Sequence, residues 1–291
     1  MIVPIATRPQ YQDHLAPIVA LLPPVDGEDI ALVASHHDLV KARRHFRRFI
    51  LAQHGAGQSY GGDPRSERIA DYPGGEDNGD VGLFLVPNEQ AAQRWRDAYP
   101  AASVAVVGSP RLETLPAREP GPGPVVAVSF HWDAKFCPEG RSAFREYAPA
   151  LDRLSQDVRL IGHGHPMRRD LVKFYRRIGV EYVPSFDDVC RRADVYVCDN
   201  SSTIFEFAAS GRPVVLLNSQ RFRRDVSHGL RFWDAADVGL QVNSPDELAA
   251  GIQNVLDCDS WGQDAREIVL SQVYPVRTAQ AAADAITDWA T

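Results

Sequence analysis

The stretch from Asp194 to Leu217 reads DVYVCDNSSTIFEFAASGRPVVLL. It begins with one apolar run, at Val195–Val197, and ends with another, at Val214–Leu217. The residues between them follow a helical pattern that stops at Gly211. Short apolar runs bounded by turn residues indicate buried strands, and glycine commonly follows the end of a helix. The stretch therefore predicts a strand, a tight turn, a helix and a second strand.

The predicted helix begins with three hydroxyl side chains and carries one acid in its first turns. The hydroxyls are those of Ser201, Ser202 and Thr203, and the acid is Glu206. A helix N-terminus has unpaired backbone N–H groups and the positive end of the helix dipole, so it favours phosphate. An acid one turn further along can reach back to ribose hydroxyls. We therefore predict that these four residues bind a nucleotide-diphosphate donor.

Composition limits the class of protein. The chain has 291 residues, enough for two domains, with 44% hydrophobic and 24% charged residues. The net charge of −7 argues against a nucleic-acid partner. The sequence shows neither a membrane-spanning apolar stretch nor a secretory signal, and its four cysteines lack zinc-site spacing. We expect a cytoplasmic protein without a metal site.

Strand-like and helix-like segments alternate along both halves of the chain. The alternation covers residues 2–107, stops at the proline- and glycine-rich segment 115–124, and restarts at Val125. This order predicts an α/β protein with two Rossmann-like, doubly wound domains and a ligand cleft between them. We place the acceptor-side domain at residues 1–117, the nucleotide-binding domain at 125–277, and a terminal helix that packs back on the first domain at 278–291.

A histidine and a glycine-rich loop follow a predicted strand of the first domain. His54 and Gly55 come directly after the apolar residues Ile50–Ala52. A histidine at a strand end is placed to act as a general base, and glycine lets a ligand approach the backbone. Gly57–Gly61 also matches the GxSxG pattern of hydrolases, but no helix-like segment follows it, as a nucleophile elbow requires.

A strand end of the second domain is likewise followed by several histidine and arginine side chains. His163, His165, Arg168 and Arg169 follow the predicted strand at 158–162, and these side chains suit an anionic ligand. His131 follows another strand, where contact with a ligand and simple packing are both open. The basic run at 41–48 is either a solvated helix face or a weak peripheral contact with a membrane surface.

These motifs together resemble the GT-B glycosyltransferase superfamily, and within it the CDP-glycerol glycerophosphotransferases of wall teichoic acid synthesis. The resemblance rests on motifs in the same order along residues 54–213: His54-Gly55, Gly108-Ser109-Pro110-Arg111, His165-Pro166 and the block Asp199–Pro213. It implies a GT-B fold, a nucleotide-activated donor and an essential histidine on each side of the cleft, matched by His54 and His165. Two positions depart from the family: Glu113 and Glu206 stand where aspartate is usual.

The sequence thus predicts a metal-independent transferase that needs no cofactor. It moves a glycosyl or glycerophosphate group from a UDP-, GDP- or CDP-linked donor to a hydroxyl of a glycan, polyol phosphate or protein. His54 and His165 are the predicted catalytic residues; Gly55, Arg168, Ser201, Ser202, Thr203 and Glu206 are predicted to bind the donor. Two alternatives stay open, a UDP-GlcNAc 2-epimerase-like enzyme and a non-catalytic nucleotide-binding module.

Overall fold

The computed structural model describes residues 1–24, 27–57, 77–133, 141–222, 238–258 and 260–290. The chain divides into two compact units. The first is formed by Met1–Thr114 and Ser271–Thr291, and the second by Leu115–Leu270. Residues 271–277 belong to the first unit, whereas the sequence prediction placed them in the second domain. Residues 115–117 belong to the second unit, whereas the prediction placed them in the first domain.

The first unit is built on a parallel sheet that has five strands in the described residues. The strands pair in sequence order, from β1 to β5. Their bounds are β1 Ile2–Ile5, β2 Ile30–Val33, β3 Arg48–Ala52, β4 Leu83–Val86 and β5 Ser103–Val106. The helices of this unit are α1 Pro9–Val19, α2 His36–Ala42, α3 Glu89–Ala98 and α10 Gln280–Ala290, with the 3-10 helix η1 at Pro110–Thr114.

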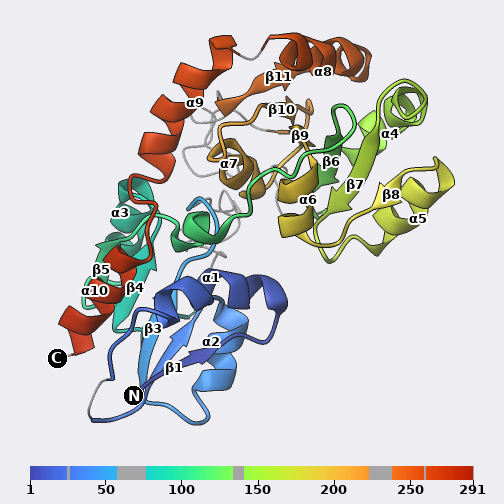
Figure 1. Ribbon diagram of the computed structural model, residues 1–291. Helices are drawn as coiled ribbons and strands as arrows, with labels where there is room; N and C mark the ends of the chain where they lie inside the picture. Colours follow the sequence, from blue (N-terminus) through green and yellow to red (C-terminus); the bar gives the residue numbers. More distant parts are fainter. Residues whose placement is uncertain (25–26, 58–76, 134–140, 223–237, 259, 291) are drawn as a thin grey trace. The chain divides into compact units, whose positions relative to one another are not determined.

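Alternate residues of these strands pack into two separate cores. Ile30 and Leu32 of β2 belong to the cluster that includes residues of α1 and α10. Ala31 and Val33 belong to the cluster that includes residues of α2 and α3. Successive side chains of a strand point to opposite faces, so helices cover both faces of this sheet (Figure 1).

The turn after β5 holds the C-terminal segment of the first unit. Gly108 has φ of +66°, and a Cβ at this position would lie 1.6 Å from the carbonyl oxygen of Val276. The N–H of Ser109 donates to that same oxygen over 3.1 Å, and the N–H of Ala279 donates to Glu113 Oε2 over 2.8 Å. These contacts place α10 beside α1 and β4.

The second unit contains a parallel sheet with six strands in the described residues. Their order is β11-β10-β9-β6-β7-β8. The chain thus builds outward from β6 through β7 and β8, then returns to β9 on the other side of β6. The bounds are β6 Val126–Phe130, β7 Leu160–Gly164, β8 Glu181–Tyr182, β9 Val195–Cys198, β10 Val214–Leu217 and β11 Leu240–Val242. The chain adds strands first on one side of β6 and then on the other, which is the pattern of a doubly wound sheet. The switch point, where the direction of strand addition reverses, lies between β6 and β9.

The helices of the second unit follow the predicted alternation. They are α4 Phe144–Leu154, α5 Arg169–Arg177, α6 Phe186–Arg192, α7 Thr203–Ala208, α8 Leu248–Asp257 and α9 Ser260–Val273, with the 3-10 helix η4 at Pro245–Glu247. The stretch Asp194–Leu217 forms β9, α7 and β10, and β9 pairs with both β10 and β6. The carboxyl ends of β6 and β9 therefore lie side by side at the switch point.

The close approach of Gly108 to Val276 yields a stability prediction. Gly108→Ala places a Cβ into the backbone of the terminal segment and also requires alanine in the left-handed region, so we expect the free energy of unfolding to fall by roughly 2–5 kcal/mol. Gly27→Ala is the matched control, because Gly27 has φ of +109° in the same unit but open space around its Cβ. Urea unfolding of both variants measures the difference; equal losses would contradict the steric account.

Candidate functional site

His54 lies at the carboxyl end of β3, held by the backbone of the neighbouring strand. Its Nδ1 lies 2.7 Å from the carbonyl oxygen of Ala34, which directly follows β2. A carbonyl only accepts hydrogen bonds, so Nδ1 carries the proton and Nε2 is the basic nitrogen of the neutral ring. The following residue, Gly55, is buried and has φ of +87°. Most of the GxSxG pattern lies in residues 58–76, outside the described residues.

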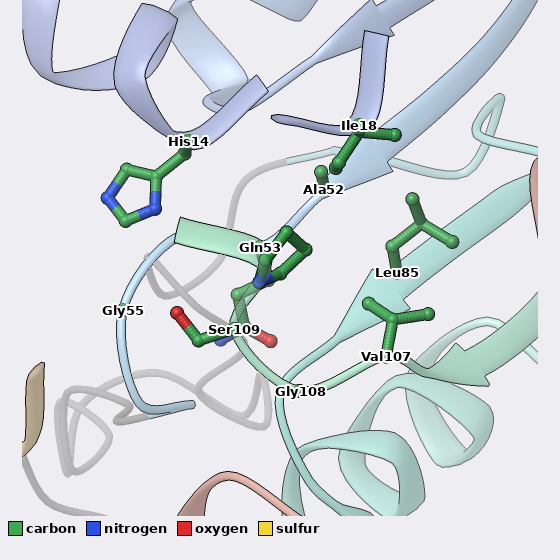
Figure 2. Close-up of a pocket in the computed structure, with 10 residues that line it drawn as sticks. His14, Ile18, Ala52, Gln53, Gly55, Leu85, Val107, Gly108 and Ser109 are labelled. Atoms are coloured by element: carbon green, nitrogen blue, oxygen red, sulfur yellow. The ribbon is translucent and has the colours of Figure 1, made fainter. Parts of the chain in front are cut away.

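Two side chains of α1 lie against this histidine. The ring centroids of Tyr11 and His14 lie 4.9 and 6.0 Å from that of His54. A cavity of about 20 Å³ is lined by His14, Gly55 and Ser109 among others. Figure 2 shows how these residues lie around it. That volume suits one water molecule or a group of similar size. The first unit thus brings the imidazoles of His14 and His54 and the hydroxyl of Ser109 to one end of its sheet.

Burial keeps both imidazoles in their neutral form. The pKa of His54 is lowered by burial, against the opposing effects of the Ala34 hydrogen bond and the charge of Asp38. The pKa of His14 lies well below its usual value because of burial and the neighbouring His54 and Arg111. Neutral His54 at physiological pH is a competent proton acceptor.

In the second unit, one buried carboxylate organises the switch point. Asp199 follows β9 and is fully buried. Its Oδ1 accepts from the backbone N–H groups of His131, at 2.8 Å, and Asn200, at 2.7 Å. Its Oδ2 accepts from the hydroxyl of Ser142 and the N–H of Ala143, both at 2.9 Å. Asp199 therefore ties together the loops after β6 and β9 and the start of α4.

The predicted catalytic residue His165 follows β7 and is half-buried. Its Nδ1 accepts from the N–H of Met167 over 3.2 Å, which leaves Nε2 to carry the proton of the neutral ring. The ring of His131 stands edge-on to it, with centroids 5.3 Å apart and planes inclined by 63°. The structure therefore brings His165 and His131 together at the ends of adjacent strands.

Arg168, predicted to bind the donor, is largely engaged by the protein itself. Its Nε and Nη2 donate to the carboxylate of Asp170, each over 2.8 Å, and its Nη1 donates to the carbonyl of His131 over 3.0 Å. The guanidinium also lies over the ring of Phe144. Arg168 thus holds the His131 loop, and a phosphate contact would have to use its remaining N–H groups.

The three predicted hydroxyls lie at the start of α7, and two of them contact each other. The Oγ1 of Thr203 lies 2.8 Å from both Ser201 Oγ and the hydroxyl of the buried Tyr196. Ser201 Oγ also accepts from the N–H of Thr203, while Ser202 is half-buried. Glu206 is only 2% exposed. Donor binding by these four residues stays a prediction.

The basic run 41–48 is partly neutralised within the first unit. Arg43 pairs with both carboxylate oxygens of Asp80, at 2.6 and 2.7 Å. Arg48 lies over the ring of Trp289. Lys41, Arg44 and Arg47 are exposed, so a contact with an anionic surface stays a prediction that rests on these three.

The described residues contain neither a cluster of metal ligands nor a membrane-spanning helix. Among them, no three His, Cys, Asp or Glu side chains gather closely enough to hold a metal ion. No helix formed by these residues is long and apolar enough to cross a bilayer.

Sequence reasoning missed several residues of these two sites. Tyr11 and His14 lie inside an ordinary amphipathic helix, and the sequence contains no signal that turns them toward His54. Asp199 belongs to the motif block, but its role as a buried acceptor depends on loops 57 and 68 residues away. His131 drew attention only through its place after a strand.

Comparisons with known proteins place this geometry among known folds. The chain matches no family model and no curated protein sequence. Among solved structures it is similar to the wall teichoic acid polymerase TagF, with 13% identity, a TM-score of 0.67, and coverage of 100% of this chain and 88% of that one. It is also similar to a Listeria monocytogenes protein assigned as a UDP-N-acetylglucosamine 2-epimerase, with 11% identity, a TM-score of 0.58, and coverage of 98% and 94%.

A third solved structure, S. aureus MnaA with UDP, has 12% identity and a TM-score of 0.58, and the match covers 98% of this chain and 93% of that one. At such low identity the likeness shows the fold. Together with the two parallel sheets, it confirms the predicted GT-B architecture.

The role of Asp199 yields a second stability prediction. Asp199→Asn replaces one acceptor oxygen with an NH₂ group that meets existing N–H or O–H donors, so we expect a loss of about 2–4 kcal/mol in the free energy of unfolding of the second unit. Asp157→Asn, at an exposed position after α4, is the matched control. Urea unfolding and amide exchange of Ala143 report the effect; similar values for both variants would refute the bridging role.

The burial of His131 yields a pH prediction. Burial lowers the pKa of His131 from 6.5 to about 4. As the pH is lowered below 6.5, the imidazole of His131 takes up a proton in the unfolded chain but not yet in the folded chain. The free energy of unfolding therefore decreases as the pH falls from about 6.5 to about 4. His131→Gln should reduce the loss of stability between pH 7 and 4.5 by up to about 2 kcal/mol. Urea unfolding at both pH values tests this, and an unchanged difference would contradict it.

Proposed function

We propose that this chain is a transferase that moves a glycosyl or glycerophosphate group from a nucleotide-activated donor to a hydroxyl of an acceptor. The observation that carries the proposal is the tautomer that the backbone imposes on each predicted catalytic histidine. His54 presents a basic Nε2, and His165 presents an Nε2–H donor. Transfer needs one group of each kind: a base for the attacking hydroxyl and a donor for the departing phosphate oxygen.

The first unit takes the acceptor in this proposal. His54 Nε2 accepts the proton of the acceptor hydroxyl as its oxygen bonds to the sugar carbon or to the phosphorus. The bond between that atom and the nucleotide breaks at the same centre. A glycosyl donor then releases a nucleoside diphosphate, and a CDP-glycerol donor releases CMP. The acceptor is a glycan, a polyol phosphate or a protein hydroxyl.

The second unit takes the donor. The loops at its switch point contain His165, Arg168 and the hydroxyls of Ser201–Thr203, and ligands of open α/β sheets bind beyond the carboxyl ends of the strands. The similar structures support a nucleotide ligand: MnaA is a complex with UDP, and a TagF variant was soaked with CDPG. Glu206 is the proposed ribose contact. Charge on the departing group is met by His165 and Arg168 without a metal ion.

An epimerase is the second candidate, because the likeness to the Listeria protein extends over 98% of this chain. An epimerase would introduce solvent deuterium into a UDP-sugar in the absence of an acceptor. A non-catalytic module would bind nucleotides without any turnover. These outcomes separate the three functions in one set of assays.

The assay measures nucleotide release from CDP-glycerol, UDP-sugars and GDP-sugars with acceptors of each class, in EDTA. We expect release from one donor, and a loss of about 10²–10⁴-fold in kcat for His54→Gln, because the proton acceptor is removed. The affinity of His54→Gln for the free nucleotide should equal that of the unmodified chain. His37→Gln, an exposed change on α2, is the control that should keep full activity.

Full activity of His54→Gln would remove His54 from the mechanism. Activity that requires an added divalent ion would overturn the metal-independent step, and deuterium incorporation without acceptor would favour the epimerase. Thermal shifts with CDP, UDP, GDP and TDP identify the base of the donor, since a ligand that binds only the folded state raises the apparent stability.

A further inference from the structure

Two neighbouring imidazoles of the second unit present opposite hydrogen-bonding groups. His131 Nδ1 lies 3.1 Å from the carbonyl oxygen of Trp132, so Nδ1 carries the proton and Nε2 is an acceptor. His165 Nδ1 accepts from the N–H of Met167, so its Nε2–H is a donor. With ring centroids 5.3 Å apart, an acceptor nitrogen and a donor nitrogen lie at the ends of β6 and β7.

This pairing selects the chemistry of a ligand. An ionised phosphate oxygen only accepts, so it suits His165 but gains nothing from the lone pair of His131. A hydroxyl can donate, so a hydroxyl next to the phosphate can satisfy His131 while His165 donates to the phosphate oxygen. His131 thus adds a preference that a phosphate site alone would lack.

The backbone around His131 is fixed from two sides. Its N–H donates to Asp199 Oδ1 and its carbonyl accepts from Arg168 Nη1. Burial favours the neutral ring, because it lowers the pKa of His131 to about 4. Both imidazoles remain half-buried rather than sealed in the core. The acceptor nitrogen is therefore held in one place and keeps its lone pair at physiological pH.

We propose that His131 accepts a hydrogen bond from a hydroxyl of the group that the nucleotide donor carries, beside the phosphate oxygen that His165 meets, which makes His131 a specificity-determining residue. The inference rests on the proposed function, because it assigns the cargo to the second unit. It predicts a hydroxyl-bearing cargo, such as a polyol or a sugar, and discrimination against a donor that lacks that hydroxyl.

The first arm of the test needs no ligand. Long-range ¹⁵N–¹H NMR of the full chain, labelled at histidine, reports the tautomer of each ring at pH 7, and single His→Gln variants assign the signals. We expect an Nδ1–H form for His131 and an Nε2–H form for His165. An Nε2–H form of His131 would overturn the inference whatever the enzyme does.

The second arm compares affinities by calorimetry. The ligands are the free nucleoside diphosphate, the cargo-bearing donor that the thermal shifts identify, and analogues of that donor with single hydroxyls removed. His131→Leu should weaken the cargo-bearing donor about five- to tenfold, the effect of one lost hydrogen bond, and leave the free nucleotide unchanged. His131→Gln, whose amide oxygen can accept, should recover most of the affinity, and one deoxy analogue should bind both variants alike.

The outcomes separate this inference from the proposed function. Donor turnover with an unchanged ratio of donor to nucleotide affinity in His131→Leu and His131→Gln would overturn the role of His131 alone. No nucleotide binding by the unmodified chain would overturn the proposed function, and the cargo assignment with it. Circular dichroism of both variants shows whether they fold; if His131→Leu does not, the deoxy analogues on the unmodified chain decide, and equal affinity for all of them would overturn the inference.

Discussion

The second unit depends on one buried carboxylate. Asp199 has no exposed surface, and its two oxygens accept from groups on the β6 loop, the β9 loop and the start of α4. A buried carboxylate is costly unless it is fully hydrogen-bonded, so the three segments are obliged to meet around it. At the switch point of a doubly wound sheet, the loops after the two neighbouring strands diverge and are far apart in the sequence. Here β6 and β9 are neighbours in the sheet, but β7 and β8 come between them along the chain. Asp199 therefore holds the loops at the switch point together, and its hydrogen bond from the backbone N–H of His131 fixes the position of that residue.

Much of the fold could be predicted from sequence, because buried parallel strands leave short apolar runs between turn residues. Val195–Cys198 and Val214–Leu217 form strands where the pattern placed them. β11 was missed because Leu240–Val242 is too short to show a pattern, and α9 because its apolar and polar residues are weakly segregated. The end of the second unit differs from the predicted domain boundary for another reason. The contact of Gly108 with Val276 joins residues 168 positions apart, and no local pattern encodes it.

The candidate sites were predictable to a different degree. Parallel strands bring their carboxyl ends to one edge of the sheet, so a histidine directly after a strand is a candidate site residue, and His54 and His165 were predicted in that way. Their tautomers were not predictable, since Ala34 and Met167 become partners only through the fold. Arg168 shows the limit from the other side. Its charge suggested a phosphate ligand, yet most of its hydrogen bonds go to Asp170 and the His131 carbonyl.

These contacts give charged and neutral side chains different roles. The charges of Asp199 and Arg168 are used mainly to hold loops. For the buried Asp199, strong hydrogen bonds offset the cost of removing the charge from water. The groups that offer defined chemistry, His54 and His131, are imidazoles whose burial keeps them neutral. A neutral imidazole presents one donor and one acceptor, and the backbone decides which nitrogen plays which part. Specificity in such a site therefore lies in the carbonyl and N–H groups that orient each ring as much as in the ring itself. A change that leaves a histidine in place but removes its backbone partner can then alter function as strongly as replacing the histidine.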